Sequence, residues 1–238
     1  MKALHPRYSW PKLSPPLSER ERAINDDWLR FWHEILPNRY GMIEKFNHTY
    51  PLRHLPDQQR FRTIEIGAGV GGHLDFEDLS RQDYFCIELR ENMAAEIKKR
   101  FPAVTVATAS CEERTDFADG YFDRAIAVHV LEHLSDLPRA IAELRRLLRA
   151  GGIFSIVIPC DPGIAYELAR QISSARIFRR RYKMPYAWLM RREHINSPAE
   201  IISTLKDGFD EVDRTYFPLS PIPAVSANLC LGLTYRRR

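Results

Sequence analysis

The sequence predicts one α/β domain with a mostly parallel sheet, and two observations support this fold class. First, a short apolar stretch at residues 63–66 runs directly into a glycine-rich turn at 67–72. Second, stretches of strand length alternate with stretches of helical periodicity over the rest of the chain. Parallel strands need crossover connections, usually helices, so this alternation is typical of a parallel sheet.

The composition narrows the class of protein. Hydrophobic residues make up 45% of the 238 residues, and no window of about 18 uncharged apolar residues is present. The first residues lack the apolar core of a secretion signal. The four cysteines lack a metal-ligand spacing, so we expect reduced thiols, a cytoplasmic location and no metal site. A net charge of +4 is too small to indicate nucleic-acid binding by itself.

Residues 1–55 are expected to form a helical arm or lid, and residues 56–238 the main domain. Four prolines predict an extended segment up to residue 17, and Ser18 with Glu21 fits a capping box. A helix is then expected to about Leu36, followed by a short helix over 39–47. The first helix can serve as packing over the sheet, as a lid over a ligand, or as both. Its apolar side would carry Ile24, Trp28, Leu29, Trp32, Ile35 and Leu36.

The glycine-rich turn is the first candidate binding site. Glycines directly after a strand allow a sharp turn and a close approach of the backbone to a ligand. We expect a helix after the turn, with its first N–H groups pointing at the ligand. A second strand at 83–88 ends on Glu88, about where a βαβ unit places a carboxylate beside ribose hydroxyls. The glycines alone also fit the dinucleotide-binding pattern.

The remaining elements follow in regular order, except for one interruption. Residues 160–192 combine eight basic residues with five aromatic ones, and they separate the fifth strand from the helix that follows. That helix has a strong start, because Ser197 and Glu200 form a capping box around Pro198. We expect helices over 91–101 and 197–206, and one further helix that ends at the glycines of 150–152. We expect strands over 104–107, 124–129, 153–158, 209–217 and 226–235.

Four segments together resemble class I S-adenosylmethionine-dependent methyltransferases of the ubiquinone/menaquinone-methyltransferase-like type. They are Glu65-Ile-Gly-Ala-Gly-Val-Gly71, the acid Glu88, the run Asp119-Gly-Tyr-Phe-Asp123 with His129-Val-Leu-Glu-His133, and Arg149-Ala-Gly-Gly152. The resemblance covers about residues 60–160. It implies a Rossmann-like three-layer sandwich, in which a seven-stranded, mostly parallel sheet has an antiparallel last strand. It also implies S-adenosyl-L-methionine as the cofactor.

The resemblance further implies a set of cofactor contacts. An acid two residues before the first glycine, here Glu65, suits a cofactor with an ammonium and a sulfonium, whereas it would repel a pyrophosphate. One departure concerns the adenine contact, because Cys111 stands where the family often has an acid, and Ser110, Glu112 or a backbone carbonyl would have to replace it. The expected cofactor-binding residues are Glu65, Gly67, Ala68, Gly69, Gly71, Glu88, Leu89, Cys111, Glu112, Val128 and His129.

An acceptor hydroxyl would need a base, and His129 and His194 are the candidate catalytic residues. His129 ends the fourth strand, where open α/β sheets place ligands. His194 belongs to a His-x-Asn element that similar methyltransferases often carry. The basic insertion would bind an anionic acceptor or an anionic membrane surface. The expected acceptor-binding residues are His133, Arg179, Arg180, Arg181, Tyr182 and Asn196.

The functional hypothesis is methyl transfer to a small-molecule acceptor, such as a hydroxyl of a phosphorylated sugar or a lipid-linked saccharide. Nucleic acid is not an expected partner, because no separate RNA-binding module is evident. Two alternatives stay open at this point. The chain can be a catalytically silent S-adenosylmethionine-binding module that acts through partners, or a nicotinamide-dependent reductase.

Overall fold

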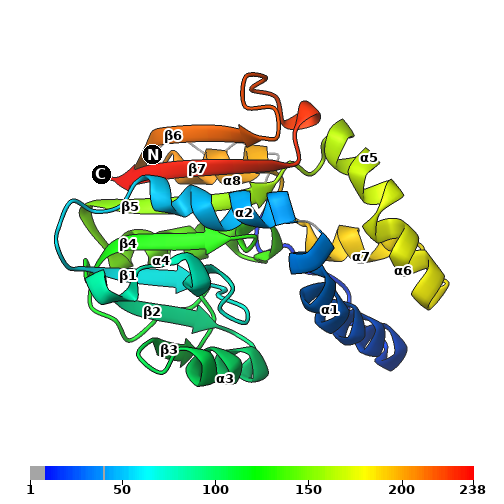
Figure 1. Cartoon of the computed structure of the whole chain (residues 1–238), viewed down its shortest axis with the longest axis horizontal. Coiled ribbons are helices and arrows are strands. Elements are labelled where there is room, and N and C mark those ends of the chain that lie inside the picture. Colours follow the sequence, from blue (N-terminus) through cyan, green and yellow to red (C-terminus); the bar gives the residue numbers. More distant parts are fainter. Residues whose placement is uncertain (1–8, 40) are drawn as a thin grey trace.

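The computed structural model describes residues 9–39 and 41–238, and its centre is a seven-stranded sheet (Figure 1). The strand order is β3-β2-β1-β4-β5-β7-β6, and β7 runs antiparallel to both β5 and β6. The expected seven-stranded sheet with an antiparallel last strand is therefore confirmed. The strands are β1 (Phe61–Ile66), β2 (Gln82–Glu88), β3 (Thr105–Thr108), β4 (Phe122–Val128), β5 (Leu148–Pro159), β6 (Phe209–Phe217) and β7 (Cys230–Arg237).

The parallel strands β1 to β5 end at one edge of the sheet, and this edge holds the candidate site. β1 lies between β2 and β4, so Ile64 and Ile66 are buried in the main core on one face. Alternate residues of the neighbouring strands, such as Tyr84 and Cys86, face a second core beneath α3. Figure 1 shows helices α1, α5, α6 and α7 gathered beyond the carboxyl ends of these strands.

The helices begin and end where the local chemistry indicates. The Asp136 side chain accepts from the Arg139 N–H at the start of α4, and the capping box of Ser197 and Glu200 is present at α8. The α-helices are α1 (Glu19–Arg39), α2 (Gly41–Thr49), α3 (Glu91–Arg100), α4 (Leu137–Leu147), α5 (Ile164–Ile172), α6 (Ser174–Tyr182), α7 (Tyr186–Glu193) and α8 (Pro198–Leu205). The 3-10 helices are η1 (Tyr50–Arg53), η2 (His73–Phe76), η3 (Leu79–Arg81), η4 (Leu131–His133) and η5 (Val225–Ala227).

The prediction of an α-helix after the glycine turn is wrong, because the chain there forms only the short 3-10 helices η2 and η3. Polar side chains of this short connection are used in a buried network. Glu77 accepts from Arg124 Nη1 at 2.8 Å and lies 2.6 Å from His73 Nε2, and all three side chains are buried. A continuous helix over this segment would move these groups away from the guanidinium of Arg124. The glycine turn is therefore not followed by an α-helix whose N-terminus could face a ligand.

A second correction concerns the helix expected to end at the glycines of 150–152. This helix, α4, ends at Leu147, and Leu148 already pairs with Phe122 at the start of β5. The backbone of Gly151 has φ +75°, and Gly152 packs so closely on backbone oxygens that a side chain would not fit. The two glycines thus shape the start of β5 and do not end a helix.

The N-terminal arm packs against the basic insertion. Ile24 and Trp28 of α1 are buried with Phe178 of α6 and with Tyr186 and Leu189 of α7. The side chains of Trp32, Ile35 and Leu36 and all of residues 1–8 lie outside the described residues. Among the helices that are described, none combines the length and the apolar character that crossing a membrane requires.

Candidate active site

The glycine turn brings the backbone of residues 67–69 to the edge of the sheet. Gly67 and Gly69 adopt φ values of +62° and +57°, a conformation that glycine reaches without steric cost. A Cβ atom at Gly67 would lie 2.5 Å from Cγ2 of Val130, so no side chain fits between the turn and the loop after β4. Gly71 has a different role, because it packs against Ile97 and Phe101.

Glu88 is joined to the glycine turn by hydrogen bonds. Its carboxylate accepts from the Gly69 N–H and from the Arg90 N–H, each at 2.9 Å, and the residue is only 4% exposed. Each carboxylate oxygen keeps further acceptor capacity for the hydroxyls of a ligand. The next residue, Leu89, is 68% exposed, although leucine is usually buried. The structure thus places an acceptor of hydrogen bonds and an open apolar surface side by side at the end of β2.

Glu65 lies in β1, behind the turn. Tyr84 donates a hydrogen bond of 2.8 Å to its carboxyl group, which is almost fully buried. Burial raises the pKa of Glu65 to about 8, although the bond from Tyr84 opposes this shift. The acid therefore holds a proton at neutral pH in the cofactor-free protein.

The two candidates for the adenine contact have different surroundings. Glu112 accepts from the Ser135 hydroxyl and from the Asp136 N–H, so its carboxylate connects the loop after β3 to the start of α4. Cys111 is half-buried against the main core, and burial raises the pKa of its thiol to about 12. Neither residue is an anionic group free to contact an amine in this structure, and the adenine contact stays a prediction.

His129 lies directly after β4, together with Val128, and has an unusual backbone conformation. Its φ is +53°, which a non-glycine residue seldom adopts. The ring Nδ1 lies 3.1 Å from Oε1 of Glu132, which is 1% exposed. Burial lowers the pKa of His129, but hydrogen bonds with Cys230 and Glu132 outweigh this effect and raise it to about 10. His129 is thus held beside Glu132 as its partner.

Glu132, His133 and His194 come together although sixty residues separate the two loops that carry them. One ligand atom from each of the three lies within 4.8 Å of the others. The backbone explains this proximity, because the carbonyl of Glu132 accepts from both Ile195 N–H and Asn196 N–H, at 2.9 and 3.0 Å. The structure therefore brings together His129, His133 and His194 of the predicted set.

Asn196 fixes the same junction with its side chain. Its amide donates to the carbonyls of Leu131 and Leu134, and its oxygen accepts from the indole of Trp10. The residue is 2% exposed, so it holds the two loops together from within. Its position indicates that it orients His194 and has no open path to an acceptor.

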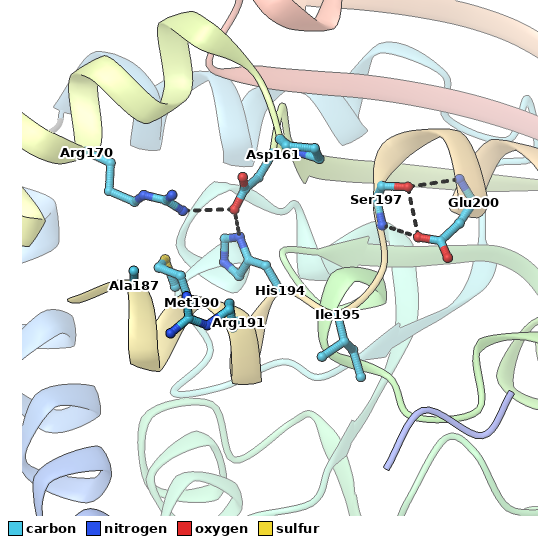
Figure 2. Close-up of a pocket in the computed structure, with 10 residues that line it drawn as sticks. Asp161, Arg170, Ala187, Met190, Arg191, His194, Ile195, Ser197 and Glu200 are labelled. Atoms are coloured by element: carbon cyan, nitrogen blue, oxygen red, sulfur yellow. Dashed lines mark hydrogen bonds and ion pairs between the residues drawn. The ribbon is translucent and has the colours of Figure 1, made fainter. Parts of the chain in front are cut away.

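A cavity of about 320 Å³ opens beside His194, between the end of β5 and helices α5 and α7 (Figure 2). Nδ1 of His194 lies 2.8 Å from Oδ2 of Asp161, which also pairs with Arg170 at 3.0 Å. Figure 2 shows this chain of three side chains along one wall. The lining residues are Asp161, Pro162, Arg170, Ala187, Met190, Arg191, His194, Ile195, Ser197 and Glu200.

Arg179, Arg180, Arg181 and Tyr182 lie on α6 and do not line this cavity. Arg181 and the Tyr182 hydroxyl both bind Asp27 of α1, and the Tyr182 ring packs against Phe178. The basic residues that do line it, Arg170 and Arg191, were not among the predicted site residues. The sequence carries the signal that residues 160–192 are basic, but it does not tell which arginines turn inward.

The turn and its surroundings fit S-adenosylmethionine better than a dinucleotide. The carboxylate of Glu88 is bonded to the turn itself, and among the described residues no α-helix begins between the turn and β2 to receive a pyrophosphate. A carboxylate at this place suits a cofactor with cationic groups. Gly67, Ala68, Gly69, Glu88 and Leu89 would hold the cofactor along the ends of β1 and β2.

Comparisons with known proteins agree with this geometry. Residues 64–156 match the family model of a methyltransferase domain. Methyltransferase AacuQ of Aspergillus aculeatus is 28% identical over 143 residues, which are 59% of this chain and 46% of that protein. Probable S-adenosylmethionine-dependent methyltransferase Rv3030 of Mycobacterium tuberculosis is 28% identical over 96 residues, which are 40% of this chain and 35% of that protein. The chain thus matches less than half the length of these relatives.

Solved structures show the same fold. The PH0226 protein of Pyrococcus horikoshii superposes with a TM-score of 0.65 at 14% identity, covering 88% of this chain and 99% of that one. A TehB-like S-adenosylmethionine-dependent methyltransferase of Corynebacterium glutamicum gives 0.62 at 13% identity, covering 91% and 100%. Together with the glycine turn and the strand order, these findings show that residues 64–156 resemble a methyltransferase domain and that the chain has the fold of the S-adenosylmethionine-dependent methyltransferase from Corynebacterium glutamicum.

Proposed function

We propose that this protein transfers a methyl group from S-adenosylmethionine to a hydroxyl of a small anionic acceptor that binds in the cavity beside His194. The observation that supports the proposal is that one loop contacts both regions. Val130 packs on Gly67, and the carbonyl of Glu132 accepts from the N–H groups of residues 195 and 196, next to His194. A methyl donor held at the turn and an acceptor in the cavity would then lie on two sides of this loop.

The cavity suits an acceptor with a negative charge. Arg170 and Arg191 line it. Both Nη atoms of Arg170 are paired, with Asp161 and Glu167. Arg191, for which no ion pair is present among the described residues, is therefore the group that would bind the acceptor. A guanidinium group binds phosphate or carboxylate through two parallel hydrogen bonds, and these orient the acceptor. A phosphorylated sugar or the head of a lipid-linked saccharide has this chemistry. Ala187, Met190 and Ile195 provide the apolar part of the lining.

His194 is the group that acts on the acceptor hydroxyl in this proposal. The carboxylate of Asp161 can only accept hydrogen bonds. Nδ1 of His194 therefore carries the hydrogen and donates this bond, and Nε2 keeps its lone pair. S-adenosylmethionine, when bound, would supply an electrophilic methyl group and leave as S-adenosylhomocysteine. Nε2 of His194 would accept the proton that the acceptor hydroxyl loses.

Association with an anionic membrane surface is a second proposal, and one face of α5 supports it. Ile164, Leu168 and Ile172 lie at helical spacing and are 78%, 63% and 69% exposed. The following helix, α6, carries Arg176, Arg179 and Arg180. Apolar side chains beside arginines are typical of helices that lie in a membrane interface. A lipid-linked acceptor would then reach the cavity from the same side.

Turnover is the test of the first proposal. Methyl transfer from radiolabelled S-adenosylmethionine would be measured with phosphorylated sugars and lipid-linked saccharides as acceptors. We expect labelled product that disappears in His194→Gln, while S-adenosylhomocysteine still binds. Cofactor binding with no turnover on any acceptor would favour the catalytically silent module. Binding of NADH in place of S-adenosylhomocysteine would favour the reductase.

The membrane proposal has a separate test. Co-sedimentation with vesicles that contain anionic lipid should retain the protein, and serine at positions 164, 168 and 172 should reduce this retention severalfold. Replacing Arg179 and Arg180 with alanine should also reduce retention. Lowering the salt concentration should increase the retention of this variant less than that of the parent. Retention that is equal for both variants and the parent would contradict the proposal.

A further inference from the structure

We propose that Glu132, His133 and His194 form a binding site for a divalent transition-metal cation of the Zn²⁺ or Mn²⁺ class. The three residues offer one carboxylate oxygen and two imidazole nitrogens, all within 4.8 Å of one another. Ligand atoms around one such ion lie about 3 to 3.5 Å apart, so small side-chain rotations would close the site. The inference deepens the proposed function, since it makes His194 a ligand of the cation in place of a base, and it rests on that function for this role alone.

The hydrogen bonds of both histidines leave the correct nitrogen available. Nδ1 of His133 lies 2.7 Å from the carbonyl oxygen of Glu193, and Nδ1 of His194 lies 2.8 Å from a carboxylate oxygen of Asp161. Both partners accept only, so both Nδ1 atoms carry the proton and both Nε2 atoms present a lone pair. Metal-ligating histidines are held in this way, by a carbonyl or a carboxylate behind the ring.

Glu132 supplies the independent observation that points to a ligand. The residue is 1% exposed, and its Oε1 lies 3.1 Å from Nδ1 of His129 and 3.8 Å from Nε2 of His133. Its other oxygen, Oε2, is buried and has no hydrogen-bond partner among the residues that the structure describes. A buried carboxylate oxygen without a partner is costly, and a cation bound by this carboxylate and the two imidazoles would remove this cost.

The scaffold around the three residues is rigid enough for a metal site. Glu132 accepts two backbone hydrogen bonds from residues 195 and 196, and Asn196 returns two from its side chain to the loop of Glu132 and His133. These contacts fix the distance between the loops before any ion binds, which lowers the entropy cost of binding. Neither cysteine spacing nor a local motif reveals this site, because the histidines come from separate loops.

The donor set selects the class of cation. Two imidazoles with one carboxylate favour Zn²⁺, Mn²⁺, Co²⁺ or Fe²⁺, whereas Mg²⁺ and Ca²⁺ prefer oxygen ligands throughout. Three protein ligands leave positions open for a further ligand. His194 lines the acceptor cavity, so an acceptor oxygen can take an open position. A hydroxyl bound to the cation would lose its proton to water more easily, and the resulting alkoxide would take the methyl group as its carbon–sulfur bond breaks and S-adenosylhomocysteine leaves.

Metal binding can be measured without catalysis. Tag-free, metal-stripped protein would be titrated with Zn²⁺ by calorimetry and with Co²⁺ by visible absorption, with Mg²⁺ as the comparison cation. We expect one Zn²⁺ or Co²⁺ per chain and no comparable binding of Mg²⁺. Affinity should fall by more than about 100-fold in Glu132→Gln, His133→Gln and His194→Gln, which remove a ligand and not merely its support.

His54→Gln is the matched control, because His54 lies beside Asp213, away from the cluster, and its loss should leave metal affinity unchanged. His133 is the most exposed ligand, at 36% of its side chain, so this variant keeps the test valid if a more buried one does not fold. Absence of stoichiometric binding, or equal binding by the His133 variant and the His54 control, would overturn the proposal. Titration of the same samples with S-adenosylhomocysteine measures cofactor binding separately. Failure of the metal site can therefore be told apart from failure of the proposed function.

Discussion

His194 and Asp161 form a hydrogen bond of 2.8 Å between Nδ1 and Oδ2, and this pair defines the wall of the acceptor cavity. The carboxylate is itself held by Arg170 at 3.0 Å, so the imidazole is oriented from behind through two successive contacts. His194 also belongs to the group of ligand-bearing side chains that it forms with Glu132 and His133. A histidine oriented in this way can act as a base or as a metal ligand, depending on what binds.

The first prediction concerns Asp161→Asn. The asparagine amide can donate to Nδ1, which would move the imidazole proton to Nε2 and block that lone pair. We expect turnover to fall by about tenfold or more, as is typical when the partner behind a histidine is changed, with S-adenosylhomocysteine affinity unchanged. Steady-state kinetics and calorimetry measure both quantities. Glu167→Gln is the control and should have a smaller effect, because it removes a partner of Arg170 and leaves the Asp161 carboxylate in place; equal turnover in Asp161→Asn and the parent would contradict the prediction.

The second prediction concerns Gly67→Ala. An alanine would have to adopt φ +62°, which costs about 1–2 kcal/mol, and its Cβ would meet Val130 at 2.5 Å. We expect lower stability in urea and loss of most cofactor affinity. Adding Val130→Ala should relieve the contact but not the backbone strain, so affinity should return only in part. Full recovery in the double variant would show that the positive φ is unimportant.

The third prediction is a pH dependence that belongs to Glu65. Burial raises its pKa from 4.5 to about 8, so between these values the folded protein holds a proton that the unfolded chain releases. The free energy of unfolding should therefore fall as pH rises across this window, by about 1.4 kcal/mol per pH unit at most. Urea unfolding from pH 5 to pH 9 measures it. Glu65→Gln keeps an acceptor for Tyr84 and should remove this component; parallel curves for the two proteins would refute the assignment.

The fourth prediction concerns the buried network behind the glycine turn. Burial would raise the pKa of Glu77, but His73 and Arg124 outweigh it and lower the pKa to about 2. Arg124 is fully buried, so Glu77→Gln would leave a guanidinium without its countercharge. We expect the free energy of unfolding to fall by about 3–5 kcal/mol. Asp75→Asn is the comparison, because its pair with Arg100 is exposed and should change stability by about 1 kcal/mol or less.

The sequence predicts the strands of the sheet and the starts of several helices well. The helical segments that it predicts wrongly have physical causes. Strands buried on both faces carry their signal locally, and capping residues such as Ser197 and Asp136 mark helix starts. The helix expected after the glycines is absent because Glu77 and His73 serve a guanidinium from β4, a contact no local pattern encodes. The helical periodicity also predicts that α4 continues to the glycines of 150–152. Instead, Leu148 pairs with Phe122 and begins β5.

The candidate site is likewise predictable in part. The contact between the ends of the first two strands, Gly69 with Glu88, follows from their spacing along the chain. The cavity does not, because Asp161, Arg170 and Arg191 reach it through the packing of α5 and α7. Charge alone cannot separate inward from outward arginines, so the sequence favours the three consecutive arginines of α6, although Arg181 binds Asp27.

The measurement that tests the central claim most directly is calorimetric titration with S-adenosylhomocysteine and with NADH. Wild type, Glu88→Ala and Glu88→Gln would be compared. We expect wild type to bind S-adenosylhomocysteine and not NADH, with affinity about tenfold or more weaker in Glu88→Ala, because ribose hydroxyls and the Gly69 N–H lose their acceptor. Glu88→Gln keeps one oxygen and should lose less. Binding of NADH alone, or unchanged affinity in folded Glu88→Ala, would contradict the account.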